Sequence, residues 1–208
     1  AMAILMIEKG ANVDYVDPYG GTALIQAAYL GQVPVVASLL SHGADPHVRN
    51  ADGTGPFMAG AGEGHLDVLM VLLDGTGVIV DEKDHDNTTA LMAACLHGHL
   101  LAAEYLLTFG ADINARNAHC YTAMNFAMHG QSKIEKELAD YKRQNRGKHD
   151  KTMQNMVDDY NIFTELVELL VTHKKAHALR APNDVAKNDR ANDHVGIGDA
   201  SDRDESDS

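Results

Sequence analysis

Histidine and cysteine side chains that could bind a metal ion are concentrated in the middle of the sequence. Cys95, His97 and His99 alternate along one short segment, and His119 and Cys120 are adjacent in a later one. A zinc site needs about four converging nitrogen or sulfur ligands, so these five residues are the best candidates for such a site. A free cysteine is also common as a small core residue, so the elements that position these side chains must decide between the two interpretations.

Motifs for other kinds of catalysis are missing from the sequence. Neither a nucleophile elbow nor a pair of catalytic carboxylates can be identified, and the two Gly-Thr-Gly segments, 53–55 and 75–77, are typical of turns. A phosphate-binding loop would need a Lys followed by Ser or Thr after its glycines. We therefore expect no catalytic residue and no cofactor, and we predict that the chain is not an enzyme.

The elements around these residues repeat along the chain. A turn begins at Asp17, Asn50, Asp84 and Asn117, which gives spacings of 33, 34 and 33 residues. The segment 84–117 is the most regular copy: it reads as a turn, a short helix, a Gly-His loop, a second helix and a Gly-Ala-Asp exit. A fixed period of this size is typical of proteins built from stacked repeats.

Three linked motifs recur in register within this period. They are Thr-Ala-Leu or Thr-Ala-Met at 22–24, 89–91 and 122–124, Gly-His or Gly-Gln at 31–32, 64–65 and 98–99, and Gly-Ala-Asn or Gly-Ala-Asp at 10–12, 43–45 and 110–112. In these motifs the chain resembles the ankyrin-repeat family over residues 3–128 and a final helix near 161–171. The resemblance implies an all-α solenoid of helix-turn-helix repeats with β-hairpin-like loops.

The repeat register gives the metal candidates a structural explanation. His65 and His99 occupy the Gly-His loop position of the family, and Cys95 takes a small buried position that alanine holds elsewhere. We therefore predict no metal site. The chain departs from the family at the motif's histidine, which is replaced by Ile25, Met58, Met92 and Asn125. Those turns are expected to lose the side-chain hydrogen bonds between His and Thr.

The expected domain organisation is one repeat domain, 1–176, followed by a disordered acidic tail, 177–208. The domain divides into a half repeat, 1–16, and repeats at 17–49, 50–83, 84–116 and 117–175. The last repeat contains an insertion at about 132–160, interpreted as a helical hairpin that opens with a capping box at Ser132 and Glu135. Residues 3–9 read as the second helix of a repeat whose first helix is missing, which predicts further repeats or another domain upstream.

The charge distribution excludes some partners. The net charge is −13, and residues 1–131 carry 14 acidic and only 4 basic side chains. An acidic body repels phosphate backbones, so nucleic acid is not an expected partner. The purely apolar run Val68–Leu73 is far below the ~18 residues needed to span a membrane. Two cysteines in unrelated contexts favour a reducing, intracellular location, cytoplasmic with the nucleus left open.

The resemblance implies a binding function. In this architecture the hairpin tips and the exposed faces of the first helices line a concave groove, which predicts a protein or peptide partner. Tyrosine is enriched at energetically important interface positions, which draws attention to the first full repeat. The expected partner-binding residues are Tyr15, Tyr19, Tyr29, Leu30, Arg49, Asp52, Glu63, Lys83, His85, Asp86, Leu96, His97, Arg116, His119 and Tyr121.

Two alternatives and one modification complete the expectations. The chain could instead be a regulatory or structural spacer that self-associates through the insertion, or the ankyrin segment of a larger enzyme or channel. The resemblance also marks Asn114, in Gly-Ala-Asp-Ile-Asn with Leu106 eight residues earlier, as a candidate for asparaginyl hydroxylation.

Overall fold

The protein is helical throughout the part that the structure describes. The computed structural model describes residues 2–144 and 151–188, with side chains to residue 176. Its helices are α1 (Met2–Glu8), α2 (Ala23–Tyr29), α3 (Val33–Ser41), α4 (Pro56–Gly62), α5 (Leu66–Leu73), α6 (Ala90–His97), α7 (Leu100–Thr108), α8 (Ala123–Gln144) and α9 (Lys151–Asn188). In these residues the only β pairing is an isolated bridge between Lys83 and Thr89. The all-α expectation is confirmed.

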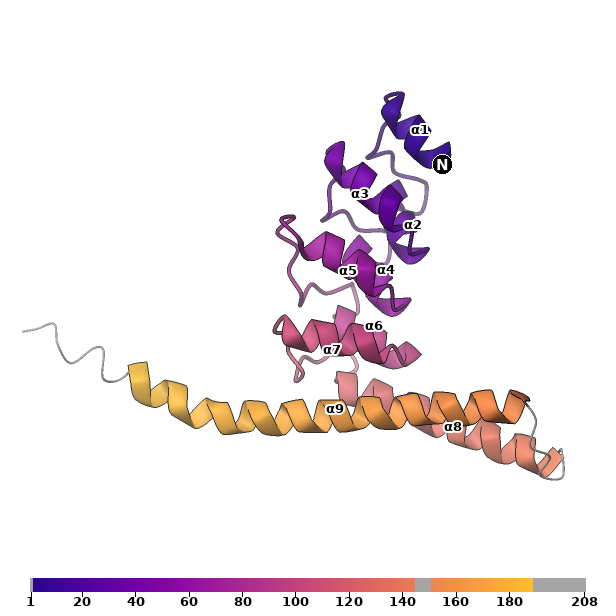
Figure 1. The fold of residues 1–208 in the computed structure, drawn as a ribbon. Coiled ribbons are helices and arrows are strands. Elements are labelled where there is room, and N and C mark those ends of the chain that lie inside the picture. The colour runs from indigo at the N-terminus through magenta and orange to yellow at the C-terminus, as the bar shows by residue number, and fades with distance from the viewer. Residues whose placement is uncertain (1, 145–150, 189–208) are drawn as a thin grey trace, which may run out of the picture. The chain divides into compact units, whose positions relative to one another are not determined.

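The helices of the first compact unit, 1–173, lie in two parallel rows. Helices α2, α4, α6 and α8 contact one another in sequence and form the inner row, while α1, α3, α5 and α7 form the outer row. Each inner helix also packs on the outer helix that follows it, so that α2–α3, α4–α5 and α6–α7 form successive layers (Figure 1). This arrangement is the expected ankyrin solenoid. The second unit begins at Lys174, within α9.

Small side chains allow the layers to approach closely. Ala28, Ala61 and Cys95 occupy the same position in three successive repeats, and all three are fully buried. Burial in this apolar environment raises the pKa of the Cys95 thiol to about 12, since removing water disfavours the thiolate. The structure thus confirms that Cys95 is a core residue.

Two of the helices that come first in their repeats, α2 and α6, begin at capping threonines, whereas α4 begins at Gly55 without a side-chain cap. Thr22 Oγ1 accepts a hydrogen bond from the Ile25 backbone N–H, and Thr89 Oγ1 accepts the same bond from Met92. A threonine at this position satisfies one of the free N–H groups at a helix start. In the fourth repeat, the Thr122 hydroxyl and backbone N–H both donate to Asn125 Oδ1 at 2.9 Å. The fourth repeat thus lacks the bond between His and Thr, as expected, but Asn125 supplies an acceptor for Thr122 in its place.

Helix α4 contains two glycines, Gly60 and Gly62, a residue type that ordinarily weakens a helix. Every residue of α4 is buried, and a methyl group added at Gly60 would lie 3.0 Å from Val68 Cγ1 of α5. A methyl group at Gly62 would meet Ala93 Cβ at 3.6 Å and His97 Nδ1 at 3.9 Å, which are ordinary contact distances. Gly60 therefore allows α4 and α5 to approach closely, whereas packing places no such demand on Gly62.

The C-terminal insertion differs from the expected hairpin in where its helices begin. Helix α8 is continuous from Ala123 to Gln144, so Ser132 lies inside it and the predicted capping box does not begin a helix. No proline lies between Ala123 and Gln144, so no residue of this stretch removes a backbone hydrogen-bond donor, and the first helix of the repeat continues through Gly130. The sequence Asn-Arg-Gly at 145–147 is where the expected hairpin would turn, and it lies outside the described residues.

Helix α9 contributes the next part of the core. Leu166 and Leu170 are fully buried and Phe163 nearly so, within the same apolar cluster as the inner helices. The expected second helix of the fourth repeat, 161–171, is the middle of α9. The helix continues to Asn188, past the boundary expected at residue 177; residues 189–208 of the expected tail lie outside the described residues.

Candidate ligand-binding groove

A groove of about 700 Å³ runs along the inner row of helices. Its walls come from the exposed faces of α2, α4, α6 and α8 and from the hairpin loops that precede them. A second hollow of about 500 Å³ continues it along α8, and the two share Leu96, Tyr121 and Phe126. The groove is lined by Ile25, Gln26, Tyr29, Asn50, Thr54, Met58, Ala59, Gly62, Glu63, Asp84, Asp86, Thr88, Met92, Ala93, Leu96, His97, Asn117, His119, Tyr121 and Phe126.

Each hairpin loop is shaped by the residue that opens its repeat. Asp84 Oδ1 accepts hydrogen bonds from the backbone N–H groups two and four residues later, at 2.9 and 2.7 Å. The side chains of Asp17, Asn50 and Asn117 accept the equivalent pairs. Only aspartate and asparagine place an oxygen close enough to their own backbone for this turn, which explains why the repeats open on these two residue types.

Backbone hydrogen bonds hold successive loops against one another. The N–H groups of Ala51, His85 and Ala118 donate to the carbonyls of the preceding loop at 2.9, 3.1 and 2.7 Å. These bonds fix the spacing of the loop tips. The groove is therefore formed before any partner binds, which reduces the entropy lost on binding.

The loops also share a left-handed backbone position. Gly20 and Gly53 have φ near +80°, and Asn87 and Cys120 occupy the equivalent positions with φ of 59° and 63°. This conformation suits glycine and is tolerated by asparagine, but it is unfavourable for other residues. A cysteine there is a source of local strain in the fourth repeat.

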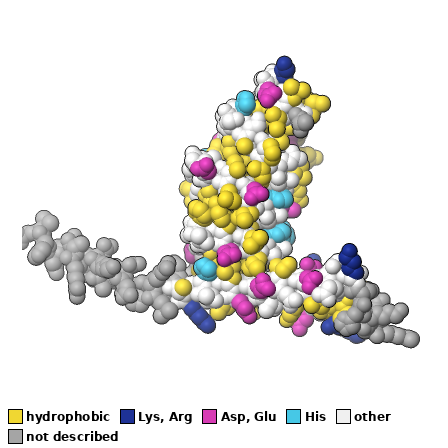
Figure 2. All heavy atoms as spheres, in the orientation of Figure 1, with side chains coloured by type: hydrophobic (Ala, Val, Ile, Leu, Met, Phe, Trp, Pro, Cys, Tyr) yellow, Lys and Arg dark blue, Asp and Glu magenta, His cyan; other side chains and the backbone are white. Residues whose placement is uncertain are grey.

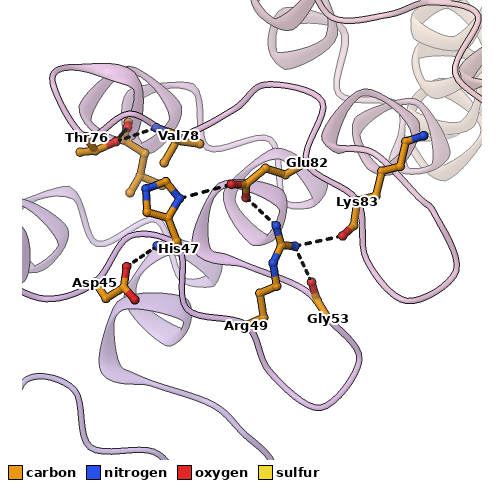
Figure 3. Close-up of polar contacts among 9 residues, drawn as sticks. Asp45, His47, Arg49, Gly53, Thr76, Val78, Glu82 and Lys83 are labelled. Carbon is orange, nitrogen blue, oxygen red and sulfur yellow. Dashed lines mark hydrogen bonds and ion pairs between the residues drawn. The ribbon is translucent and has the colours of Figure 1, made fainter.

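Arg49 joins two neighbouring loops (Figure 3). Its Nη1 donates to the carbonyls of Gly53 and Lys83, both at 3.0 Å, and its Nη2 lies 3.1 Å from Glu82 Oε2. His47 Nδ1 lies 3.3 Å from the other oxygen of the same carboxylate. The guanidinium of Arg49 thus positions the loops. Arg116 Nη1 makes the equivalent bond to the carbonyl of Cys120 at 3.2 Å.

Three histidines bond to backbone carbonyls where first helices end. His65 Nε2 donates to the carbonyl of Tyr29 at 3.0 Å, and His97 Nδ1 donates to that of Gly62 at 2.6 Å. His99 is half-buried and also bonds to the Gly62 backbone. Burial first, and then the neighbouring His97 ring, lower the pKa of His99 below its ordinary value. The Gly-His loop histidines link successive repeats.

The candidate metal ligands do not converge. Cys95 is buried and Cys120 is exposed, and His97 and His99 are used in bonds to backbone. Within residues 2–144 and 151–188 no group of three or more His, Cys, Asp or Glu has the geometry to hold a metal ion. The same stretch contains no helix that is long and apolar enough to cross a membrane.

The structure brings only part of the expected partner-binding set into the groove. The members that line it are Tyr29, Glu63, Asp86, Leu96, His97, His119 and Tyr121. The members that lie elsewhere on the loops and helix ends are Tyr15, Tyr19, Leu30, Arg49, Asp52, Lys83, His85 and Arg116. Asn114 is exposed in the exit turn after α7, and its hydroxylation stays a prediction.

Sequence reasoning missed the apolar bottom of the groove. Ile25, Met58 and Met92 occupy one position in three successive repeats, and all three line the groove while being largely buried. This is the position at which the family's histidine is replaced, so the signal was visible as a departure from the motif. Phe126, beside it on α8, was also missed.

Comparison with known proteins agrees with this architecture. The family description "Ankyrin repeats (3 copies)" matches residues 39–117 and 57–155, and "Ankyrin repeat" matches residues 19–51. Ankyrin repeats generally mediate interactions between proteins, and the family is typically non-catalytic.

Individual relatives with similar sequences are proteins of different kinds. Alpha-latrotoxin-Lg1a of Latrodectus geometricus is 26% identical over 205 residues, which is 92% of this chain and 14% of the toxin. SH3 and multiple ankyrin repeat domains protein 2 of Homo sapiens is 32% identical over 62% of this chain and 7% of that protein. Palmitoyltransferase AKR1 of Lachancea kluyveri is 30% identical over 65% and 19%. The chain spans less than a fifth of the length of these relatives.

The matches to the family cover most of the chain, and the paired helices, capped starts and hydrogen-bonded loops account for its repeated motifs. The chain belongs to the ankyrin-repeat family.

Proposed function

We propose that this chain is a non-catalytic interaction module that binds a protein or peptide partner in the groove of the inner row. The observation that carries the proposal is the groove itself, in which exposed apolar and aromatic side chains alternate with acidic ones. Leu96 and Tyr121 are 38% and 53% exposed there, although both are large apolar residues. Large exposed side chains in a preformed concave surface are typical of binding sites.

The titratable side chains support a non-catalytic role. A nucleophilic cysteine needs a lowered pKa, whereas burial raises the pKa of Cys95 to about 12. The histidines His65 and His97 donate to backbone carbonyls that end first helices, which is a structural task. Two unpaired cysteines also agree with a location inside the cell.

A matched pair of leucine substitutions tests the proposal. Leu96→Asp places a charge in the groove, and Leu101→Asp places the same charge on α7 of the outer row, where Leu101 is 65% exposed. Extract from the source organism would be passed over the immobilised wild-type chain and both variants, and captured proteins quantified by mass spectrometry. We expect at least one protein to be retained by wild type and Leu101→Asp but reduced more than tenfold by Leu96→Asp. Circular dichroism would show that both variants are folded.

Equal capture by all three chains would contradict the proposal. In that case the groove would not be the binding surface, and any retained protein would bind elsewhere.

A further inference from the structure

We infer that the partner presents a basic segment with an apolar anchor: a Lys or Arg beside Glu63 and Asp86, and a large apolar side chain in the hollow formed by Leu96, Phe126 and Met128. The inference deepens the proposed function and rests on it. It follows from the charges that line the groove, from the availability of the two carboxylates, and from the apolar hollow next to them.

The charge of the groove has one sign. Glu63, Asp84 and Asp86 line it, and no Lys or Arg does. The guanidiniums of the hairpin loops are already engaged: Arg49 and Arg116 donate to loop carbonyls, and Arg49 is also paired with Glu82. Figure 2 shows more acidic than basic side chains on the face of the repeats that it draws. A concave surface lined by one sign of charge attracts the opposite charge and speeds its association, which favours a cationic partner.

Two of the three carboxylates are available to a ligand. Asp84 is used inside its turn, where Oδ1 accepts two backbone N–H groups. Asp86 is exposed at the tip of the same hairpin, and Glu63 is half-buried at the end of α4. In the described part of the chain neither forms an ion pair with Lys or Arg. A cation from a partner would give both a charge-assisted hydrogen bond, the stronger kind.

The apolar hollow lies next to these carboxylates along the inner row. It is lined by Leu96, Tyr121, Asn125, Phe126, Met128 and His129 and has a volume of about 500 Å³. Met128 is 54% exposed, and the Tyr121 and Phe126 rings stand edge to face with centroids 6.1 Å apart. Methionine adapts to different apolar shapes, and aromatic rings accept both apolar groups and an Arg plane.

The positions of the two carboxylates and the apolar hollow along the groove set the spacing of the cation and the apolar side chain in the ligand. The carboxylates belong to the α4 end and the hairpin before α6, whereas the hollow belongs to α6 and α8. An extended segment lying in the groove would therefore place its cation and its apolar side chain on the same face, a few residues apart. Acidic and purely polar segments meet either repulsion or an unfilled hollow.

A phage-displayed library of random 12-residue peptides, selected on the immobilised chain, tests the inference. We expect the enriched peptides to contain Lys or Arg within a few residues of a large apolar residue. Their dissociation constants, measured by fluorescence polarisation, should rise at least tenfold in the double variant Glu63→Gln, Asp86→Asn. The control Asp67→Asn, on α5 of the outer row, should change them less than twofold. Raising salt should also weaken binding, because mobile ions screen exposed charges.

The other outcomes separate the two proposals. Enriched peptides without an excess of Lys or Arg, or with equal affinity for the double variant and the control, overturn the inference. If Leu96→Asp still abolishes their binding, the groove function survives. Peptides that bind Leu96→Asp as well as wild type contradict both proposals, and a library with no enriched peptide overturns the inference.

Discussion

The contact between Phe163 and Gly130 yields a prediction in which a substitution should reverse its usual sign. Gly130 lies in the interior of α8 and is buried. A methyl group added there would overlap the ring of Phe163 in α9, and the same ring lies 3.0 Å from the methyl position of Gly98. Phe163 thus packs where the third and fourth repeats meet, and Gln131 Nε2 donates to Thr164 Oγ1 beside it at 2.9 Å.

The magnitudes can be worked from these contacts. Replacing a helical glycine by alanine ordinarily stabilises a helix by about 1 kcal/mol. Overpacking a core costs about 1–3 kcal/mol, and the overlap with a buried ring lies at the upper end of that range. We therefore expect Gly130→Ala to lower the free energy of unfolding by about 2 kcal/mol. Phe163→Ala should lower it by about 3–5 kcal/mol, since it leaves a cavity.

The two substitutions together give the sharper test. In the Phe163→Ala background the overlap is gone, so Gly130→Ala should raise the free energy of unfolding by about 1 kcal/mol. The two backgrounds would then differ by about 3 kcal/mol, a coupling expected only of residues in contact. The assay is urea unfolding followed by circular dichroism. Gly62→Ala, whose methyl would meet Ala93 at 3.6 Å, is the control and should stabilise by about 0.5–1 kcal/mol.

Two results would refute this reasoning. The first is a Gly130→Ala protein that is as stable as the Gly62→Ala control. The second is an equal effect of Gly130→Ala in both backgrounds, which would show that Phe163 does not contact this glycine.

Four further predictions concern the thiols, the pH dependence and the loops. In the native protein at neutral pH, a thiol reagent should modify Cys120 quickly but Cys95 only after denaturation, because Cys95 is buried and its pKa is raised to about 12. Fast modification of both cysteines would contradict this prediction. Cys120→Gly should raise the free energy of unfolding, measured by urea denaturation, by about 1 kcal/mol, because φ of residue 120 is positive. An unchanged free energy of unfolding would mean that the loop is not strained. The pKa of His99 is lowered in the folded state, so the unfolded chain binds a proton at this side chain more readily. The urea midpoint should therefore be highest above pH 6.5 and decrease toward pH 5. His99→Gln should flatten this decrease, and an unchanged slope would exclude His99 as its source. Glu82→Gln removes the carboxylate charge paired with Arg49 and should lower the free energy of unfolding by about 1 kcal/mol. An unchanged melting temperature would show that the backbone hydrogen bonds alone hold the loops together.

Much of the fold follows from local sequence signals. The openings at Asp17, Asn50, Asp84 and Asn117 predict the turns because their side-chain oxygens reach only nearby N–H groups. The threonines before α2, α6 and α8 and the buried alanine and cysteine positions follow from the same period, which Gly55 breaks before α4. Signals of this kind act within a few residues, so one sequence suffices to detect them.

The groove was only partly predictable. Tyr29, Glu63 and Tyr121 line it as expected, whereas Tyr19 is 79% exposed on a loop outside it. Family register places a residue on a helix face or a hairpin tip, but the depth of a groove depends on how large the neighbouring side chains are. For this reason the sequence did not predict Met58 and Met92, which form the bottom of the groove.

By itself, the sequence determined the repeat, its period and the residues that shape each turn, since these depend on contacts within one repeat or between repeats of fixed spacing. The tertiary structure alone decided how the chain ends the stack. Nothing local to Gly130 shows that α8 continues through it, or that Phe163, 33 residues later, packs on it. That contact joins the first and second helices of the fourth repeat across the insertion that separates them in the sequence, and its geometry depends on how α9 packs on α8.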